Sequence, residues 1–264
     1  SHFDGTLTGL LTTMDAAGID MSMALAVANK ASTVLRTNEW IGQIPRDRLI
    51  PAGTVHPGLS PEENLASLRD NGIRAVKLHP LFQDVAFADP KVIDLMHALA
   101  ADGVTVLTHV GAGGDAAANE RGNPVALRAL IDAVPTLRLI AFHYGGYHQL
   151  EAAQELIVGA PVLLETSWPP SVATLDPHVV RNLVRRHGTD RVVFGTDWPM
   201  TDPAAEIAAI RALGLEPAEE VAILGAEEVP FAHLAEVVVQ HAQGTPLRGR
   251  DARRQRARHG PRRG

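Results

Sequence analysis

Six polar side chains stand at the ends of apolar runs along this 264-residue sequence. They are His56, His79, His109, His143, Glu165 and Asp197, separated by 23, 30, 34, 22 and 32 residues. Imidazoles and carboxylates that converge from different strands supply nitrogen and oxygen ligands, which suit Zn²⁺ and leave one position open for water. The chain has no cysteine, so thiolate ligands, thiolate nucleophiles and disulfides are excluded. The six residues therefore predict a metal or acid–base site.

Asp197 is the strongest single candidate and lies in the run GTDWP. A carboxylate that ends an apolar run is costly to bury without a partner. An aspartate here could instead cap the next helix, but Asp202 before Pro203 already supplies that cap. We therefore predict that Asp197 binds a metal or acts as a general base. Trp198 is predicted to wall the same pocket.

His143 and His109 share this context. His143 precedes two glycines, in the run FHYGG, and glycine lets the backbone approach a ligand closely. Either ring could be a core histidine that is satisfied by a backbone carbonyl. In register with Asp197, both are predicted to be functional. His56 is expected to be structural, and the histidines on helices and in the tail, including His187, are expected to lie on the solvated surface.

Lys77 and His79 alternate along one predicted strand, so both should face the same interior. A buried lysine is costly unless it is paired or modified. Lys77 could bind substrate, pair with Glu165, or form a structural ion pair, and His79 could share the substrate-binding role. Glu165 could also hold a ligating histidine in the correct tautomer.

Short apolar runs and amphipathic segments alternate along the chain. Strands are predicted at 21–28, 49–56, 74–79, 104–110, 138–143, 161–166 and 191–197. Helices are predicted at 6–17, 61–70, 90–101, 124–134, 148–158, 177–187, 203–213 and 217–224. Four helices begin with Ser-Pro or Asp-Pro, a pattern typical of an N-cap followed by proline.

The alternation predicts a parallel sheet covered by helices on its faces. A doubly wound open sheet would normally carry a glycine-rich phosphate loop, and neither G-x-G-x-x-G nor a P-loop occurs. A (β/α)₈ barrel of about 250 residues spends about 31 residues on each unit, close to the observed spacing. We therefore predict a distorted (β/α)₈ barrel whose first strand is missing or truncated, because seven strands are found and helix 6–17 has none before it.

Composition divides the chain into three parts. Residues 1–226 are predicted to form the barrel, 227–243 a C-terminal helical segment and 244–264 a disordered Arg-rich tail. Eight of the 24 basic residues and one of the 30 acidic residues lie from Arg248 onward, which leaves 16 basic against 29 acidic residues before it. An acidic body argues against nucleic-acid binding, and no apolar stretch approaches the ~18 residues of a membrane span. With no leader pattern at Ser1, a cytoplasmic protein is expected, acting on a small molecule, with a homo-oligomer left open.

Five motifs occur in an order that resembles one family. They are MDAAGID at 14–20, GIRAVKLHP at 72–80, the His109 strand, HYGG at 143–146 and GTDWP at 195–199. Over residues 6–225 they resemble the amidohydrolase-related metal-dependent hydrolases, in the "amidohydrolase 2" branch. The resemblance implies a distorted barrel with one divalent metal ion, zinc first and manganese as the alternative. Its members include hydrolases, lactonases and non-oxidative decarboxylases of aromatic or unsaturated acids.

The resemblance also implies residue roles. His109 matches a metal ligand, His143 a histidine that holds the reactive water or substrate, and Asp197 a metal ligand that also transfers protons. The family ends its first strand in His-x-His, so His2 is expected to be the second member of that pair, with the first just before Ser1. After Gly225 the chain departs from the family, because Ala-Glu-Glu replaces an Asn-Ala helix cap.

Hydrolysis by a metal-activated water at Asp197 is the function that this resemblance implies first. The substrate would be a small carboxylate, ester, lactone or amide. Non-oxidative decarboxylation on the same site is the alternative. A catalytically impaired fragment or relic is the second alternative, because the first-strand histidine pair is incomplete.

Overall fold

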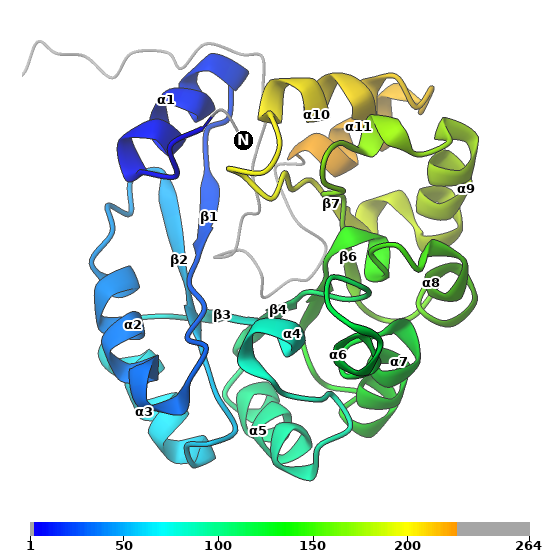
Figure 1. The fold of residues 1–264 in the computed structure, drawn as a ribbon. Coiled ribbons are helices and arrows are strands. Elements are labelled where there is room, and N and C mark those ends of the chain that lie inside the picture. Colours follow the sequence, from blue (N-terminus) through cyan, green and yellow to red (C-terminus); the bar gives the residue numbers. More distant parts are fainter. Residues whose placement is uncertain (1–2, 226–264) are drawn as a thin grey trace, which may run out of the picture.

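The computed structural model describes residues 3–225, and these residues form one curled parallel sheet surrounded by helices (Figure 1). Its seven strands pair in chain order, each with the next. They are β1 (Ser22–Leu25), β2 (Leu49–Thr54), β3 (Ala75–Leu78), β4 (Thr105–Thr108), β5 (Leu139–Ala141), β6 (Leu163–Glu165) and β7 (Val192–Val193). Within the described chain no strand joins β7 to β1, so the barrel is incomplete there. The predicted barrel with a missing strand is confirmed.

Most strands are shorter than predicted, because their polar ends leave the sheet to build loops. The backbone N–H of His143 donates to the Glu165 side chain instead of a neighbouring strand. The N–H of Phe194 donates to the carbonyl of Ile223, which ends the ladder after Val193. His143 and Asp197 also have positive φ angles of 59° and 53°, which strand residues do not adopt.

All eight predicted helices are present, with small changes at their ends. They are α1 (Leu7–Ala17), α3 (Pro61–Asp70), α5 (Pro90–Ala101), α7 (Pro124–Ala133), α8 (Leu150–Leu156), α9 (Pro177–His187), α10 (Pro203–Arg211) and α11 (Pro217–Gly225). Three further helices were not predicted, namely α2 (Val34–Gly42), α4 (Pro80–Gln83) and α6 (Ala116–Glu120). In this part of the chain, no helix is both long and apolar enough to cross a membrane.

Local capping explains where the predicted helices begin. The side chain of Ser60 accepts from the N–H of Glu63, and Glu63 reaches back to the Ser60 N–H in a capping box. Asp89, Asp176 and Asp202 each accept a backbone hydrogen bond from the first turn of the following helix. Because Asp202 is the N-cap of α10, Asp197 does not cap this helix.

Two apolar layers position the site. The larger layer packs the helices against the outer face of the sheet. A smaller one fills the inside of the curl and contains Ala52, Ala75, Leu107, Ile140, Phe142, Leu163 and Val193. Interior residues of neighbouring strands therefore meet at the centre, and side chains one or two positions further along open above them at the carboxyl ends.

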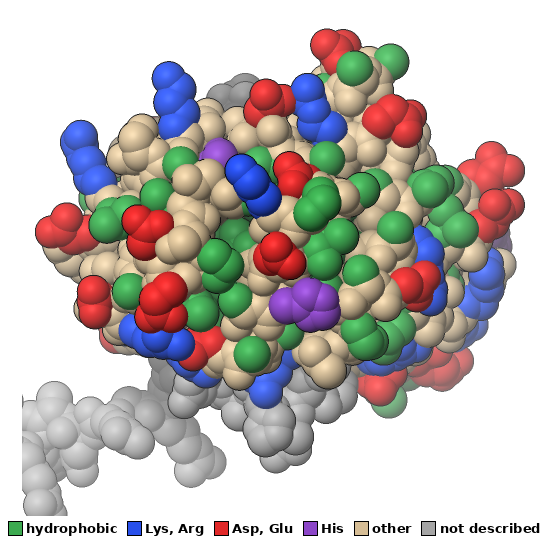
Figure 2. Space-filling view, turned by 90° about the horizontal axis from the view of Figure 1, so that it is seen from below, with side chains coloured by type: hydrophobic (Ala, Val, Ile, Leu, Met, Phe, Trp, Pro, Cys, Tyr) green, Lys and Arg blue, Asp and Glu red, His purple; other side chains and the backbone are tan. Residues whose placement is uncertain are grey.

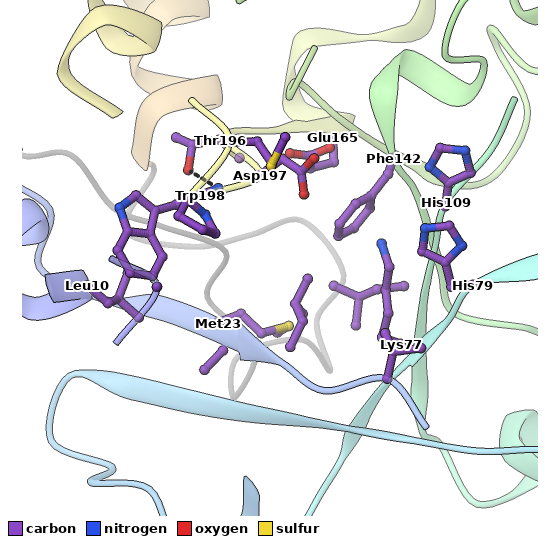
Figure 3. Close-up of a pocket in the computed structure, with 18 of the residues that line it drawn as sticks. Leu10, Met23, Lys77, His79, His109, Phe142, Glu165, Thr196, Asp197 and Trp198 are labelled. Atoms are coloured by element: carbon purple, nitrogen blue, oxygen red, sulfur yellow. Dashed lines mark hydrogen bonds between the residues drawn. The ribbon is translucent and has the colours of Figure 1, made fainter. Parts of the chain in front are cut away.

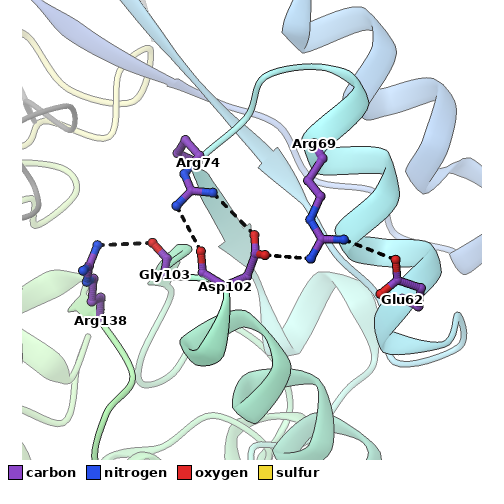
Figure 4. Close-up of polar contacts among 6 residues, drawn as sticks. All are labelled: Glu62, Arg69, Arg74, Asp102, Gly103 and Arg138. Carbon is purple, nitrogen blue, oxygen red and sulfur yellow. Dashed lines mark hydrogen bonds and ion pairs between the residues drawn. The ribbon is translucent and has the colours of Figure 1, made fainter.

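Polar contacts at the opposite end of the strands serve the scaffold. Arg69 pairs with Glu62 and with Asp102, and Arg74 pairs with the same aspartate (Figure 4). These residues precede β3 and β4, so the network lies at the amino end of the sheet. Figure 2 shows acidic and basic side chains interspersed with apolar ones on the face seen from below.

The two ends of the sheet are bridged from outside. Helix α1 packs on α10, so the first and last described units touch although β1 and β7 do not pair. The ring of Phe3 lies 6.1 Å from that of Trp198. The described chain therefore begins beside the loop that follows β7. The segments predicted at 227–243 and 244–264 lie outside the described residues.

Candidate active site

One cavity of about 980 Å³ gathers seven of the eight predicted site residues. Lys77, His79, His109, His143, Glu165, Asp197 and Trp198 all line it. Figure 3 shows Lys77 and the two histidines His79 and His109 on one side, with Glu165 and Asp197 toward the other. The eighth residue, His2, lies outside the described residues. The cavity stands at the carboxyl ends of the strands, where a parallel barrel carries its active site.

The histidines form a contiguous group. Nε2 of His143 lies 3.1 Å from Nδ1 of His109, and the ring of His79 stacks on that of His109 with centroids 4.6 Å apart. Nε2 of His109 lies 3.1 Å from the Ala112 carbonyl oxygen, and Nδ1 of His143 lies 3.0 Å from that of Ser167. The chain thus uses backbone carbonyls to hold the outer nitrogens of this pair.

Glu165 is buried beneath His143 and acts on it through Ser167. The Ser167 hydroxyl donates to Oε2 of Glu165 at 2.8 Å and lies 3.0 Å from Nδ1 of His143. Oε2 also accepts from the His143 backbone N–H at 3.3 Å. Gly195 leaves room for this carboxylate, because a Cβ there would overlap Oε1. Glu165 therefore positions the His143 segment, and Ser167 is a contact that sequence reasoning missed.

Lys77 is buried but holds no ion pair. Its side chain is 5% exposed, and Nζ lies 3.2 Å from the centroid of the Phe142 ring. Within residues 3–225, Nζ makes no hydrogen bond and no salt bridge. Of the three roles considered for Lys77, neither the pairing with Glu165 nor another ion pair of its amine forms within the described residues.

Burial sets the charge states of the cavity. Desolvation lowers the pKa of His79 to about 2 and of His109 to about 4, and it holds the pKa of His143 well below its usual value. Desolvation also raises the pKa of Glu165 to about 7. These imidazoles are therefore neutral at pH 7, while Glu165 can exchange a proton near that pH.

Asp197 and Trp198 come from the loop after β7. The Asp197 side chain is exposed to the cavity, yet the surrounding protein still raises its pKa by desolvation, with Lys77 opposing the rise. The Trp198 backbone N–H donates to Oγ1 of Thr196 at 3.3 Å. Its indole N–H is buried and has no hydrogen-bond partner among residues 3–225. The loop thus presents one carboxyl group with a raised pKa and one indole N–H donor that has no partner among the described residues.

The described residues do not fit a metal ion by themselves. Within residues 3–225 no group of three or more His, Asp or Glu side chains is arranged to hold one. The nitrogens of His109 and His143 that could face an ion instead contact each other. The predicted ligand His2 lies outside this range. The described residues therefore assemble imidazoles and carboxyl groups around a cavity without completing a three-ligand set.

Two other histidines test the predictions made for them. His56 does not line the cavity, and its Nδ1 accepts from the Gly58 N–H at 2.9 Å, which fits a structural role. The prediction that His187 lies on the solvated surface is wrong. His187 is 0% exposed, its Nδ1 accepts from the Gly159 N–H, and its Nε2 donates to the Val162 carbonyl. It continues the apolar face of α9.

Comparison with known proteins places the chain in a recognised group. A family model described as amidohydrolase matches residues 7–229. No curated protein matches the chain. Solved structures with similar folds include a TIM-barrel protein of uncharacterised function from Bordetella bronchiseptica, with 18% identity and a TM-score of 0.66 over 83% of this chain and 79% of that one.

Two of the similar structures carry functional names. One is 5-carboxyvanillate decarboxylase from Novosphingobium aromaticivorans in complex with manganese, with 18% identity and a TM-score of 0.63 over 82% of this chain and 77% of that one. Another is a Pseudomonas putida protein assigned as a 2-pyrone-4,6-dicarboxylic acid hydrolase, with 17% identity and a TM-score of 0.58 over 82% and 83%. At these identities the likeness shows the fold.

Proposed function

The chain belongs to the amidohydrolase family, and from that premise we propose that it is an enzyme that decarboxylates a small organic acid, with Asp197 as the group that supplies the proton. One observation carries the proposal. Asp197 is a carboxyl group that lines a cavity whose three histidines are neutral at pH 7, and desolvation raises its pKa. A carboxyl group placed in this way can deliver a proton to a carbanion.

The cavity offers a suitable environment for losing CO₂. Leu107, Phe142 and Met23 line it beside the polar residues. An apolar surrounding weakens the solvation of a substrate carboxylate more than that of the transition state, in which its charge is spreading. Lys77 and His79 stand where they would contact the reacting end of the substrate, and Trp198 would wall the remainder.

The proton then replaces the lost carboxylate. As the carbon–carbon bond breaks, its electron pair stays on carbon and takes the proton from Asp197. Burial raises the pKa of Glu165 to about 7, and this residue supplies a second carboxyl group in the same cavity. Its contact with the His143 backbone and with Ser167 keeps the His143 ring in place during this step.

Hydrolysis is the second candidate, and the His109–His143 pair favours it. Both rings are neutral and both line the cavity, so either could accept a proton from an attacking water. The manganese in the decarboxylase from N. aromaticivorans makes Mn²⁺ and Zn²⁺ the ions to supply in assays. No step here is assigned to a metal, because the described residues do not complete a ligand set.

A substrate panel tests both candidates. We would assay 5-carboxyvanillate, 2,6-dihydroxybenzoate and 2-pyrone-4,6-dicarboxylate with protein treated with chelator and with protein given Zn²⁺ or Mn²⁺. Release of CO₂ that falls by about 10²-fold or more in Asp197→Asn and not in Asp94→Asn, an exposed aspartate on α5, supports the proposal. Ring opening without CO₂ supports hydrolysis. No turnover of any of these three acids under either condition would count against both candidates for this class of substrate.

A further inference from the structure

Lys77 is a buried residue of the cavity, and no salt bridge within residues 3–225 accounts for a lysine at this position. Its side chain is 5% exposed, and its amine contacts the face of Phe142 instead of a carboxylate. Burying an ammonium ion without an ion pair is expensive, so such a lysine is normally paired or neutral. In residues 3–225 there is no salt bridge to Nζ. The face of Phe142 stabilises the ammonium form in part, whereas burial without a salt bridge favours the free amine.

We propose that Lys77 is the nucleophile of this site, and that its amine condenses with the ketone of a 3-oxo acid so that the resulting imine draws in the electrons released with CO₂. The inference rests on the proposed decarboxylation and names the substrate class for it. A desolvated lysine in an apolar pocket is a known way to make an amine nucleophilic.

The electrostatics of the cavity agree with this role. Desolvation lowers the pKa of Lys77 to about 7, against the opposing attraction of Asp197 and Glu165. A substantial fraction of the amine is therefore unprotonated at neutral pH. Both carboxyl groups line the same cavity as Lys77, so they are placed for the proton transfers of imine formation.

The chemical balance is complete without an external oxidant or metal. The lone pair of Nζ forms a bond to the ketone carbon, and the carbinolamine loses water after a carboxyl group protonates its hydroxyl. The bond between the α-carbon and the carboxylate then breaks, CO₂ leaves, and the electron pair forms an enamine. Asp197 protonates the α-carbon, and water hydrolyses the imine to release the ketone and restore the amine. In sum, one 3-oxo carboxylate and one proton become a ketone and CO₂.

The position of the carbonyl follows from this chemistry. An imine accepts the electron pair only when its carbon is attached to the carbon that carries the carboxylate, which defines a 3-oxo acid. Aromatic acids without a ketone, such as those acted on by the decarboxylases with a similar fold, cannot react in this way. The two substrate classes therefore separate the inference from the broader proposal.

Reductive trapping tests the inference directly, because the chain has only three lysines, Lys30, Lys77 and Lys91. The full chain, treated with chelator, is incubated with acetoacetate and sodium cyanoborohydride and then mapped by peptide mass spectrometry. We expect one adduct per chain, on Lys77, and at least about tenfold less labelling in Lys77→Arg. Lys30 and Lys91 are exposed and report background labelling, and Lys91→Arg is the matched control.

Other outcomes overturn the inference. Equal labelling of wild type and Lys77→Arg, or adducts only on Lys30, Lys91 and the amino terminus, would show that Lys77 is not a nucleophile. Lys77→Met keeps the volume without the charge, and thermal melts of both variants separate loss of folding from loss of the amine. Turnover of the aromatic acids without an adduct on Lys77 leaves the decarboxylase proposal standing and removes this one. An adduct on Lys77 without any release of CO₂ would show a nucleophilic amine but overturn its role in decarboxylation.

Discussion

Two buried histidine environments in this molecule look alike by burial and differ in their hydrogen bonds. His187, between α9 and β6, and His109, in the cavity, are both buried, and desolvation lowers the pKa of each to about 4. Around His187, one nitrogen accepts from the Gly159 N–H and the other donates to the Val162 carbonyl. A single neutral tautomer therefore satisfies both of its partners.

The His109–His143 pair cannot be satisfied in the same way. The Ala112 and Ser167 carbonyls each accept, so they call for protons on the outer nitrogens of the two rings. Two neutral rings then present unprotonated nitrogens to each other across 3.1 Å. The comparison teaches that burial and a lowered pKa do not mark a site. A ring nitrogen that lacks a hydrogen-bond donor beside a cavity does mark a site.

Replacing His143 should give the largest effect on activity. His143→Asn removes one ring of the unsatisfied pair, and we expect kcat/KM for the cognate acid to fall by about 10²-fold or more. The free energy of unfolding should change by no more than about 1 kcal/mol. A buried ring with one nitrogen that lacks a hydrogen-bond donor contributes little net stability. Steady-state kinetics and urea unfolding on the same preparation would measure both. A loss of stability with activity retained would break the comparison.

His187→Ala should show the opposite pattern. It leaves the Gly159 N–H and the Val162 carbonyl without partners and opens a cavity beside α9. We expect the free energy of unfolding to fall by about 2–4 kcal/mol, with kcat/KM within about twofold of wild type. His97→Ala, at an exposed position of α5, is the control and should change neither quantity.

The pH dependence of stability sharpens the same contrast. The folded pKa of His187 is about 4, below the usual 6.5, so the unfolded chain binds more protons between these values. The contribution of His187 is complete above pH 6.5 and is lost as the pH falls toward 4. The stability advantage of wild type over His187→Ala should therefore shrink by up to about 1.4 kcal/mol per pH unit. Urea unfolding at pH 7, 6 and 5 would measure it, and an unchanged advantage would contradict the lowered pKa of His187.

Ser167→Ala should give the smallest effect and the most specific one. The hydroxyl hydrogen bond helps to hold down the pKa of Glu165, so its removal should raise that pKa further. We expect kcat to fall by about three- to tenfold, equivalent to about 0.7–1.4 kcal/mol. The pH–rate profile should shift toward higher pH, whereas a purely structural role would lower the rate without moving the profile. Ser171→Ala, at the N-cap of a short turn away from the cavity, is the matched control.

Local signals made most of the fold predictable. Ser60, Asp89, Asp176 and Asp202 cap helices through contacts within three residues, so the sequence alone contains the whole interaction. The apolar strand runs likewise depend on neighbours of the same kind. Helix α2 was not predicted because its buried residues include the polar Asn38, whose side chain forms hydrogen bonds with the backbone of Thr54 on β2. That partner is distant in the chain.

The residues of the site could be predicted from the sequence, but the hydrogen bonds between them could not. Residues such as His109 and Asp197 stood out because polar groups ended apolar runs. Ser167 has no such mark, since its role depends on Glu165 and His143 meeting across two strands. His187 did leave a signal, because Val180, Leu183, Val184 and His187 follow the spacing of one helical face and all four are buried.

The strand order has a consequence for how the molecule comes apart. Within residues 3–225 each strand pairs only with its sequence neighbours, so the described sheet is a linear array rather than a closed ring. In a ring, every unit is supported from both sides. Among the described residues β1 and β7 each have one partner strand, and the α1–α10 contact and the rings of Phe3 and Trp198 link the terminal units. Fraying can therefore start at either end and advance inward one unit at a time. Asp197, in the loop after β7, lies beside one of these ends, whereas His109 follows the central strand β4. Asp197 and His109 therefore keep their relative positions only while every strand–helix unit between them stays folded.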